Sequence, residues 1–153
     1  MRRKDKEIRD INLINSIIKR ANVCRIGMSE NNIPYIVPMN FGYKDNCLYF
    51  HSASEGKKID IIKKNNNVCF EIDIEHEISQ GKSACHTTMK YYSVIGYGKA
   101  YIMDDFEEKI NALNIILEHY LPDVPYEYSD KLLKNIVIIK VEVEKMTGKN
   151  SGY

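Results

Sequence analysis

A strand–turn–strand–helix pattern between Pro34 and Lys64 constrains the fold of this chain more than any other feature. Residues 35–42 alternate between two sets of side chains, with the period of two that a pleated strand imposes. The polar turn Lys44-Asp45-Asn46 separates this strand from a second one that runs to His51. The pattern predicts an antiparallel hairpin, which is followed directly by a short helix.

Polar and basic side chains gather where the second strand of this hairpin ends. The segment 51–58 carries His51, Ser52, Ser54, Lys57 and Lys58, and Ser54 is a suitable N-cap for the short helix. Free N–H groups and the dipole at a helix N-terminus favour a bound anion. Each residue alone is more often a cap or part of a solvated face, but their coincidence after one hairpin favours a phosphate site.

The rest of the chain shows further strand and helix patterns. Residues 75–84 are polar and have no apolar period, so this segment is predicted to be a loop. Asp104 or Asp105 is expected to cap a helix. The other predicted strands are 23–29, 68–74, 89–103 and 136–143, and the other predicted helices are 8–21 and 106–120.

Six strands, three helices and no regular βαβ alternation predict a mainly β fold with flanking helices, an antiparallel barrel that fills one domain over residues 1–153. The chain has no GxGxxG motif after a first strand and no GxxxxGK[ST] motif. A phosphate-bearing cofactor would therefore need a different scaffold.

Composition excludes several function classes. The formal net charge of +1 gives no global field for nucleic acid or anionic lipid. No apolar run approaches the length of a membrane span, and acidic residues interrupt the basic start, so we expect a cytoplasmic protein. The cysteines are widely spaced: Cys24, Cys47 and Cys69 are expected to be buried in strands, while the role of Cys85 beside His86 stays open. No metal site is expected.

Four motifs together resemble a known family. VPMNFGY, LYFHSASEGKK, NNNVCFEID and MKYYSVIGYGKA are similar to the pyridoxamine 5'-phosphate oxidase-related flavoproteins, and most of all to their nitroimidazole resistance branch. The resemblance implies a six-stranded FMN-binding split barrel. It also implies a homodimer with FMN between the subunits.

The same resemblance implies where FMN would bind. The flavin ring would run along Val37, Pro38, Met39 and Asn40, and the ribityl phosphate would meet His51, Ser52, Lys57 and Lys58. The partner subunit would contribute the positions of Tyr92, Ser93 and Val94.

The resemblance implies an oxidoreductase, with reduction of nitroimidazole-type molecules as one possible activity and no assigned catalytic residue. The resemblance implies that the vitamin B6 oxidases grip substrate phosphate with basic residues of a C-terminal segment, whereas this chain has Glu144 to Lys149 and a short tail there, so pyridoxal phosphate synthesis is not expected. Two alternatives stay open. One is a non-catalytic flavin store, sensor or electron relay; the other is a barrel that holds haem or a deazaflavin, with His51, His76, His86 and His119 as candidate haem ligands.

Overall fold

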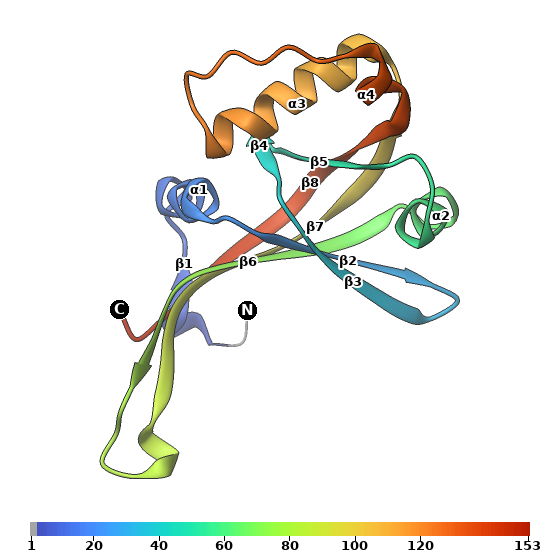
Figure 1. Cartoon of the computed structure of the whole chain (residues 1–153). Helices are drawn as coiled ribbons and strands as arrows, with labels where there is room; N and C mark the ends of the chain where they lie inside the picture. Colours follow the sequence, from blue (N-terminus) through green and yellow to red (C-terminus); the bar gives the residue numbers. More distant parts are fainter. Residues whose placement is uncertain (1–2) are drawn as a thin grey trace.

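The computed structural model describes residues 3–153 and has one curled antiparallel sheet at its centre (Figure 1). Its strands are β1 (Glu7–Ile8), β2 (Cys24–Glu30), β3 (Ile33–Met39), β4 (Gly42–Lys44), β5 (Cys47–Ala53), β6 (Asn67–Ser79), β7 (Thr88–Met103) and β8 (Ile136–Ser151). The strand order is β3-β2-β6-β7-β8-β5-β4, and β1 adds to β8. The predicted mainly β fold is confirmed, but the sheet has eight strands rather than six.

The two additional strands, β1 and β4, are too short to show an alternating pattern in the sequence. They form because longer neighbours pair with them: β1 pairs with β8, and β4 pairs with β5. The predicted hairpin is therefore present, but its first strand is divided into β3 and β4 around Asn40 and Phe41.

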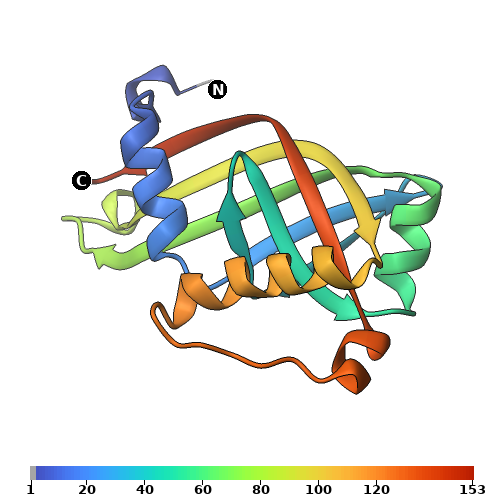
Figure 2. The same cartoon turned by 90° about the horizontal axis from the view of Figure 1, so that it is seen from above.

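Four α-helices surround the sheet: α1 (Ile11–Arg20), α2 (Lys57–Lys64), α3 (Phe106–Tyr120) and α4 (Asp130–Asn135). Two short 3₁₀ turns, η1 (Lys4–Lys6) and η2 (Ala84–His86), complete the elements. Both views place α1 and α2 on opposite sides of the curled sheet, with α3 between them (Figures 1 and 2). None of the helices in the described part of the chain has the length and apolar character needed to cross a bilayer.

Caps decide where the helices begin. The α3 prediction is confirmed, because the Asp105 carboxylate accepts the N–H groups of Glu107 at 2.9 Å and Glu108 at 3.1 Å. Helix α1 starts later than predicted, since Asp10 caps it and Ile8 belongs to β1. The predicted Ser54 cap is wrong: α2 starts at Lys57, after Gly56. The short helix α4 was not predicted.

Two strands run further than their apolar alternation. Strand β6 continues through the predicted loop to Ser79, and β8 continues to Ser151. Both extensions pair with β7, so backbone hydrogen bonding continues where the apolar pattern has ended. As a result, the last residues of β6 and the first residues of β7 form an arm that extends away from the rest of the molecule (Figure 1).

The apolar core has two parts. The larger part fills the inside of the curled sheet, with Phe41, Phe50 and Phe70 as its largest side chains. The smaller part lies under α3 and α4, around Leu113 and Ile138. These two parts bury most of the side chains that face inward on β2, β5, β6, β7 and β8, whereas the inward-facing residues of the edge strand β3 are only partly buried.

Cysteine burial differs from the prediction at two positions. All four cysteines are free, as expected, and Cys24 is fully buried. Cys69, however, is exposed, because its neighbours Val68 and Phe70 face the core and strand residues alternate. Cys47 is half-buried for the same reason. Cys85 lies exposed in η2 at the end of the arm.

Candidate functional site

Strand β3 forms a free edge of the sheet. It pairs with β2 on one side only, so the backbone groups on its other side have no strand partner. Val37 and Met39 turn toward the core, whereas Pro38 faces outward and Asn40 lies exposed just after the strand. The structure thus presents Val37–Asn40 as an edge whose unpaired backbone groups can bond a flat polar ligand.

The start of α2 lies beside this edge. The Lys57 ammonium lies 4.6 Å from the ring centroid of Tyr35 in β3. No side chain in the described part of the chain caps α2, whose N-cap is Gly56 with a φ of 121°. An L-residue rarely adopts this conformation, so the glycine is required for the chain to enter the helix here. The first N–H groups of the helix are available to an anion.

His51 and the α2 lysines make this end of the molecule cationic. Burial of the half-buried His51 lowers its pKa, and the positive charge of Lys58 lowers it further. Within residues 3–153, the ion pairs made by lysines include neither Lys57 nor Lys58. We call the group of His51, Lys57, Lys58 and the start of α2 the cationic cluster.

Ser52 does not share the orientation of His51. Because successive strand residues face opposite sides, Ser52 turns to the core and is only 4% exposed. Its hydroxyl donates to the backbone oxygen of Ala53 at 3.0 Å. The structure therefore brings His51, Lys57 and Lys58 together, and leaves the Ser52 hydroxyl occupied.

The predicted partner residues lie far from the cationic cluster within one chain. Ser93 pairs with Lys149 on β8, whereas His51 pairs with Ile138 of the same strand. Measured along β8 at the usual rise per residue, these two positions are roughly 35 Å apart. Val94 is fully buried, and the ring of Tyr92 stacks on that of Tyr153 at 4.9 Å between centroids. If these positions contribute to the same site, they must come from a second chain.

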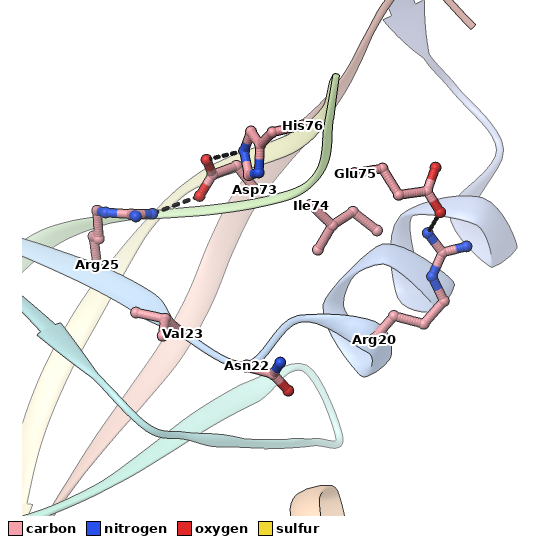
Figure 3. Close-up of a pocket in the computed structure, with 8 residues that line it drawn as sticks. All are labelled: Arg20, Asn22, Val23, Arg25, Asp73, Ile74, Glu75 and His76. Carbon is pink, nitrogen blue, oxygen red and sulfur yellow. Dashed lines mark hydrogen bonds and ion pairs between the residues drawn. The ribbon is translucent and has the colours of Figure 1, made fainter. Parts of the chain in front are cut away.

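A second group of polar residues lies at a bulge in β6 (Figure 3). It lines a cavity of about 430 Å³, which we call the bulge pocket. The pocket adjoins the β3 edge, because Arg25 in β2 is the direct cross-strand neighbour of Pro38. Its lining residues are Arg20, Asn22, Val23, Arg25, Asp73, Ile74, Glu75 and His76.

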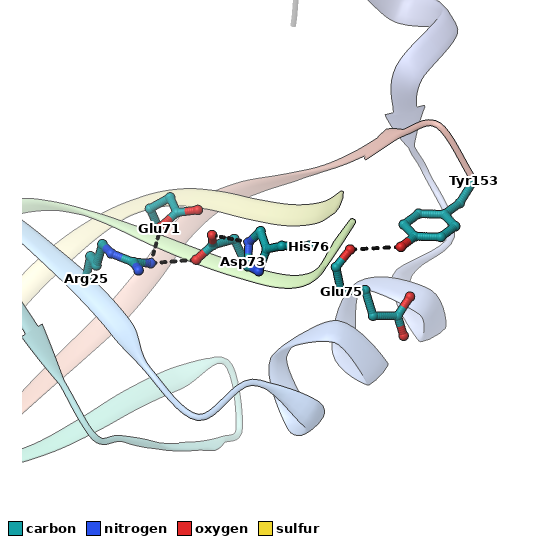
Figure 4. A network of polar contacts seen from close by, with 6 residues as sticks. All are labelled: Arg25, Glu71, Asp73, Glu75, His76 and Tyr153. Atoms are coloured by element: carbon teal, nitrogen blue, oxygen red, sulfur yellow. Dashed lines mark hydrogen bonds and ion pairs between the residues drawn. The ribbon is translucent and has the colours of Figure 1, made fainter. Parts of the chain in front are cut away.

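Ion pairs fix most of the charged side chains of the bulge pocket (Figure 4). Nη1 of Arg25 donates to Glu71 at 3.0 Å and to Asp73 at 2.5 Å. The other oxygen of Asp73 lies 2.5 Å from Nε2 of His76, and Arg20 pairs with Glu75. These contacts raise the pKa of Arg25, mainly through Asp73. Burial raises the pKa of Glu71, and the neighbouring Asp73 raises it further.

The bulge pocket was not predicted from the sequence. A signal was present, since Glu71 and Asp73 alternate with the inward-facing Phe70 and Ile72 and so share one face of a strand. In β2, Arg25 likewise lies between two buried residues and therefore faces outward. What the sequence does not show is that β2 and β6 are neighbours, which brings the opposite charges together.

Each of the other histidines uses one ring nitrogen in a contact within the chain. A ring nitrogen of His76 contacts Asp73, one of His86 lies 2.6 Å from the Ser83 hydroxyl, and one of His119 lies 2.7 Å from the Ala21 carbonyl oxygen. In the described part of the chain, no group of three or more His, Cys, Asp or Glu side chains is arranged to hold a metal ion.

The curled antiparallel sheet, with a cationic cluster beside its free edge, defines a split barrel suited to a phosphate-bearing cofactor. A family model described as pyridoxamine 5'-phosphate oxidase matches residues 11–150, and the chain belongs to this family. The resemblance found in the sequence is thereby confirmed. No curated protein sequence matches the chain.

Solved structures agree with this assignment. A candidate 5-nitroimidazole antibiotic resistance protein from Bacteroides thetaiotaomicron is 40% identical, with a TM-score of 0.83 over 94% of this chain and 85% of its own. The flavocytochrome Anf3 from Azotobacter vinelandii is 16% identical, with a TM-score of 0.88 over 100% of this chain and 72% of its own. An FAD- and haem-binding protein from Mycobacterium smegmatis is 12% identical, with a TM-score of 0.88 over 97% and 74%. The last two show the fold alone.

Proposed function

We propose that this chain is an FMN-dependent oxidoreductase that reduces nitroimidazole-type small molecules. One observation carries the proposal: a free strand edge lies beside two lysines, Lys57 and Lys58, that make no ion pair within residues 3–153, and Lys57 contacts Tyr35 of that strand. A flavin mononucleotide has a flat polar ring and a phosphate, which match these two features. The 40% identical resistance protein supports the choice of substrate class.

The residues present fit this cofactor. Those backbone groups of the segment Val37–Asn40 that point away from β2 would bond the polar edge of the ring; Pro38 lacks an N–H and can offer only its carbonyl oxygen. Lys57, Lys58 and the first N–H groups of α2 would bind the phosphate, and His51 would donate a further hydrogen bond to it from its ring. When bound, FMN supplies the hydride or electron transfer, and the protein restricts access to it.

The proposal includes a homodimer with the cofactor between the subunits. On the outer face of the sheet, Ile36 is 62% exposed, Ile95 43% and Tyr97 49%, and an exposed apolar face of this kind suits a second copy. Among the three predicted partner positions, Ser93 alternates with the core residue Val94 and so lies on the outer side of β7, but it is only 7% exposed within one chain. Beside it, Nζ of Lys149 lies 4.8 Å from the Tyr91 ring centroid. We also propose a cytoplasmic location, which four free cysteines support.

Anaerobic turnover tests this function. Reduced, FMN-loaded protein should convert a 5-nitroimidazole to its reduced products, with consumption of the nitro absorbance band. Unchanged nitroimidazole under these conditions would contradict the proposed activity while leaving flavin binding intact. A protein that binds FMN but does not accelerate the oxidation of NADH or NADPH would instead be a flavin store, sensor or relay.

A further inference from the structure

We propose that the bulge pocket binds the nitro group of an aromatic substrate, or another uncharged group with two coplanar acceptor oxygens. The inference rests on the proposed function, because a flavin along the β3 edge would form one wall of the binding site. It goes further in that it assigns substrate recognition to Arg25, Arg20 and the bulge of β6.

The position of the pocket favours this role. Arg25 stands opposite Pro38 and Cys24 stands opposite Met39, so the pocket adjoins the part of β3 expected to hold the flavin ring. The cationic cluster lies at the other end of this strand, near Tyr35. A molecule in the bulge pocket would therefore approach the ring and not the phosphate.

The two guanidinium groups are held in place before any ligand arrives. Arg25 uses Nη1 for both of its carboxylate partners, and its Nε and Nη2 have no hydrogen-bond partner among residues 3–153. Arg20 is anchored by Glu75 on the other side of the pocket (Figure 3). A planar guanidinium presents parallel donors, which suit a planar group with two acceptor oxygens.

The charge balance selects an uncharged acceptor. Glu71, Asp73 and Glu75 oppose only two arginines, so an anion would meet no net positive charge from these ion pairs. A nitro group carries two acceptor oxygens and no net charge, and it can accept from the remaining arginine donors without displacing a carboxylate. Val23 and Ile74 provide apolar surface for an attached ring.

The bulge itself builds the pocket. Between Ile74 and Glu77, β6 has one residue more than the facing segment of β7, and Glu75 adopts a φ of 58°. Without this extra residue, positions 73 and 76 would face opposite sides of the strand. The bulge turns His76 to the side of Asp73, where the two form their contact. Such strained, non-glycine positions often occur at functional sites.

The test uses FMN-loaded, oxidised protein without an electron donor, so that binding is measured and no turnover occurs. A 5-nitroimidazole is titrated into ¹⁵N-labelled protein, and the same imidazole without its nitro group, or with a carboxylate in its place, serves as a control ligand. We expect amide shifts at residues 20–25 and 73–76 for the nitro compound, and clearly weaker binding of both controls.

Variants then test the role of Arg25. Arg25→Lys keeps the charge but removes the planar fork, and should weaken binding of the nitro compound about tenfold. Arg25→Met should weaken it at least as much, and a melting curve shows whether each variant is folded. Arg9→Met is the matched control, because Arg9 is highly exposed and pairs only with Glu7; its affinity should match that of the wild type.

The outcomes separate this inference from the proposed function. Retained flavin with equal affinities for the nitro compound in wild type and Arg25→Lys, or shifts confined to other residues, would overturn the bulge pocket alone. Failure to retain flavin would overturn both. Retained flavin with nitro-dependent shifts that Arg25→Lys weakens would support both.

Discussion

The two polar regions beside β3 differ in how their charges are paired. In the cationic cluster, Lys57 and Lys58 make no ion pair within the described residues, and Lys58 lowers the pKa of His51. In the bulge pocket, both arginines are paired with carboxylates of β6. Unpaired cations repel one another until an anion binds, whereas a paired network is complete by itself. If the proposed function is right, one end of β3 binds an anion, whereas the other end holds a pocket whose charged groups are already paired and whose remaining Arg25 donors suit an uncharged ligand.

The largest expected effect concerns the cationic cluster. Replacing both lysines in Lys57→Ala/Lys58→Ala should weaken FMN binding by on the order of 1 to 3 kcal/mol for each charged hydrogen bond removed. Fluorescence quenching of FMN measures this loss. Lys63→Ala/Lys64→Ala carries the same charge change at the other end of α2 and should bind FMN nearly as well as wild type. Equal affinity in all three proteins would remove the distinction between the two ends of the helix.

Gly56 tests whether the backbone of the cationic cluster is as important as its charges. Gly56→Ala places a Cβ in open space, so only the φ of 121° opposes it. We expect unfolding free energy to fall by about 1 to 3 kcal/mol, or the entry to α2 to rearrange and weaken FMN binding. Chemical denaturation and FMN titration measure the two effects. If both quantities stay at wild-type values, the strained conformation at Gly56 is not needed.

Stability without cofactor should distinguish the two regions directly. Arg25→Met leaves Glu71 and Asp73 without their shared cation and should lower the unfolding free energy by about 1 kcal/mol, a modest value because the pair is partly exposed. Lys57→Ala/Lys58→Ala should leave it unchanged or slightly higher. Thermal melts of flavin-free protein compare them. If the lysine variant loses as much stability as Arg25→Met, the two regions do not differ in how much their charged side chains stabilise the fold.

The smallest expected effect is a pH dependence. In the flavin-free protein the pKa of His51 is below its ordinary value, so the ring is neutral at pH 7. A bound phosphate would raise this pKa, and binding would then take up a proton. FMN affinity should therefore increase severalfold as pH falls from about 8 to about 6.5, and His51→Gln should flatten the slope. Riboflavin, which has no phosphate, should show little dependence; an equal slope for riboflavin would argue against His51 beside the phosphate.

Much of the fold could be predicted because local patterns agree with it. The alternation in residues 35–42 and the apolar stripe behind Asp105 have their expected structures in β3 and α3. The ends of β6 and β8 could not be predicted, since they depend on pairing with β7. The start of α2 was misplaced because Ser54 is a good cap by residue type, while the chain turns at Gly56 instead.

In the candidate site, too, local sequence predicts some features, while others depend on how distant segments pair. His51, Lys57 and Lys58 are close in sequence, so their proximity in space could be anticipated. Ser52 shows the limit of that reasoning, because a strand turns it away from His51. Arg25, Asp73 and His76 come from separate segments, and only the strand order and the bulge bring them together.

The most direct test of flavin binding is the absorption spectrum of the purified protein, recorded before and after addition of FMN and removal of the excess by gel filtration. If the β3 edge and the cationic cluster bind FMN, flavin bands will stay with the protein at about one FMN per chain, in a fraction that elutes as a dimer. A spectrum without retained flavin after this treatment would contradict the assignment of the β3 edge and the cationic cluster as a cofactor site.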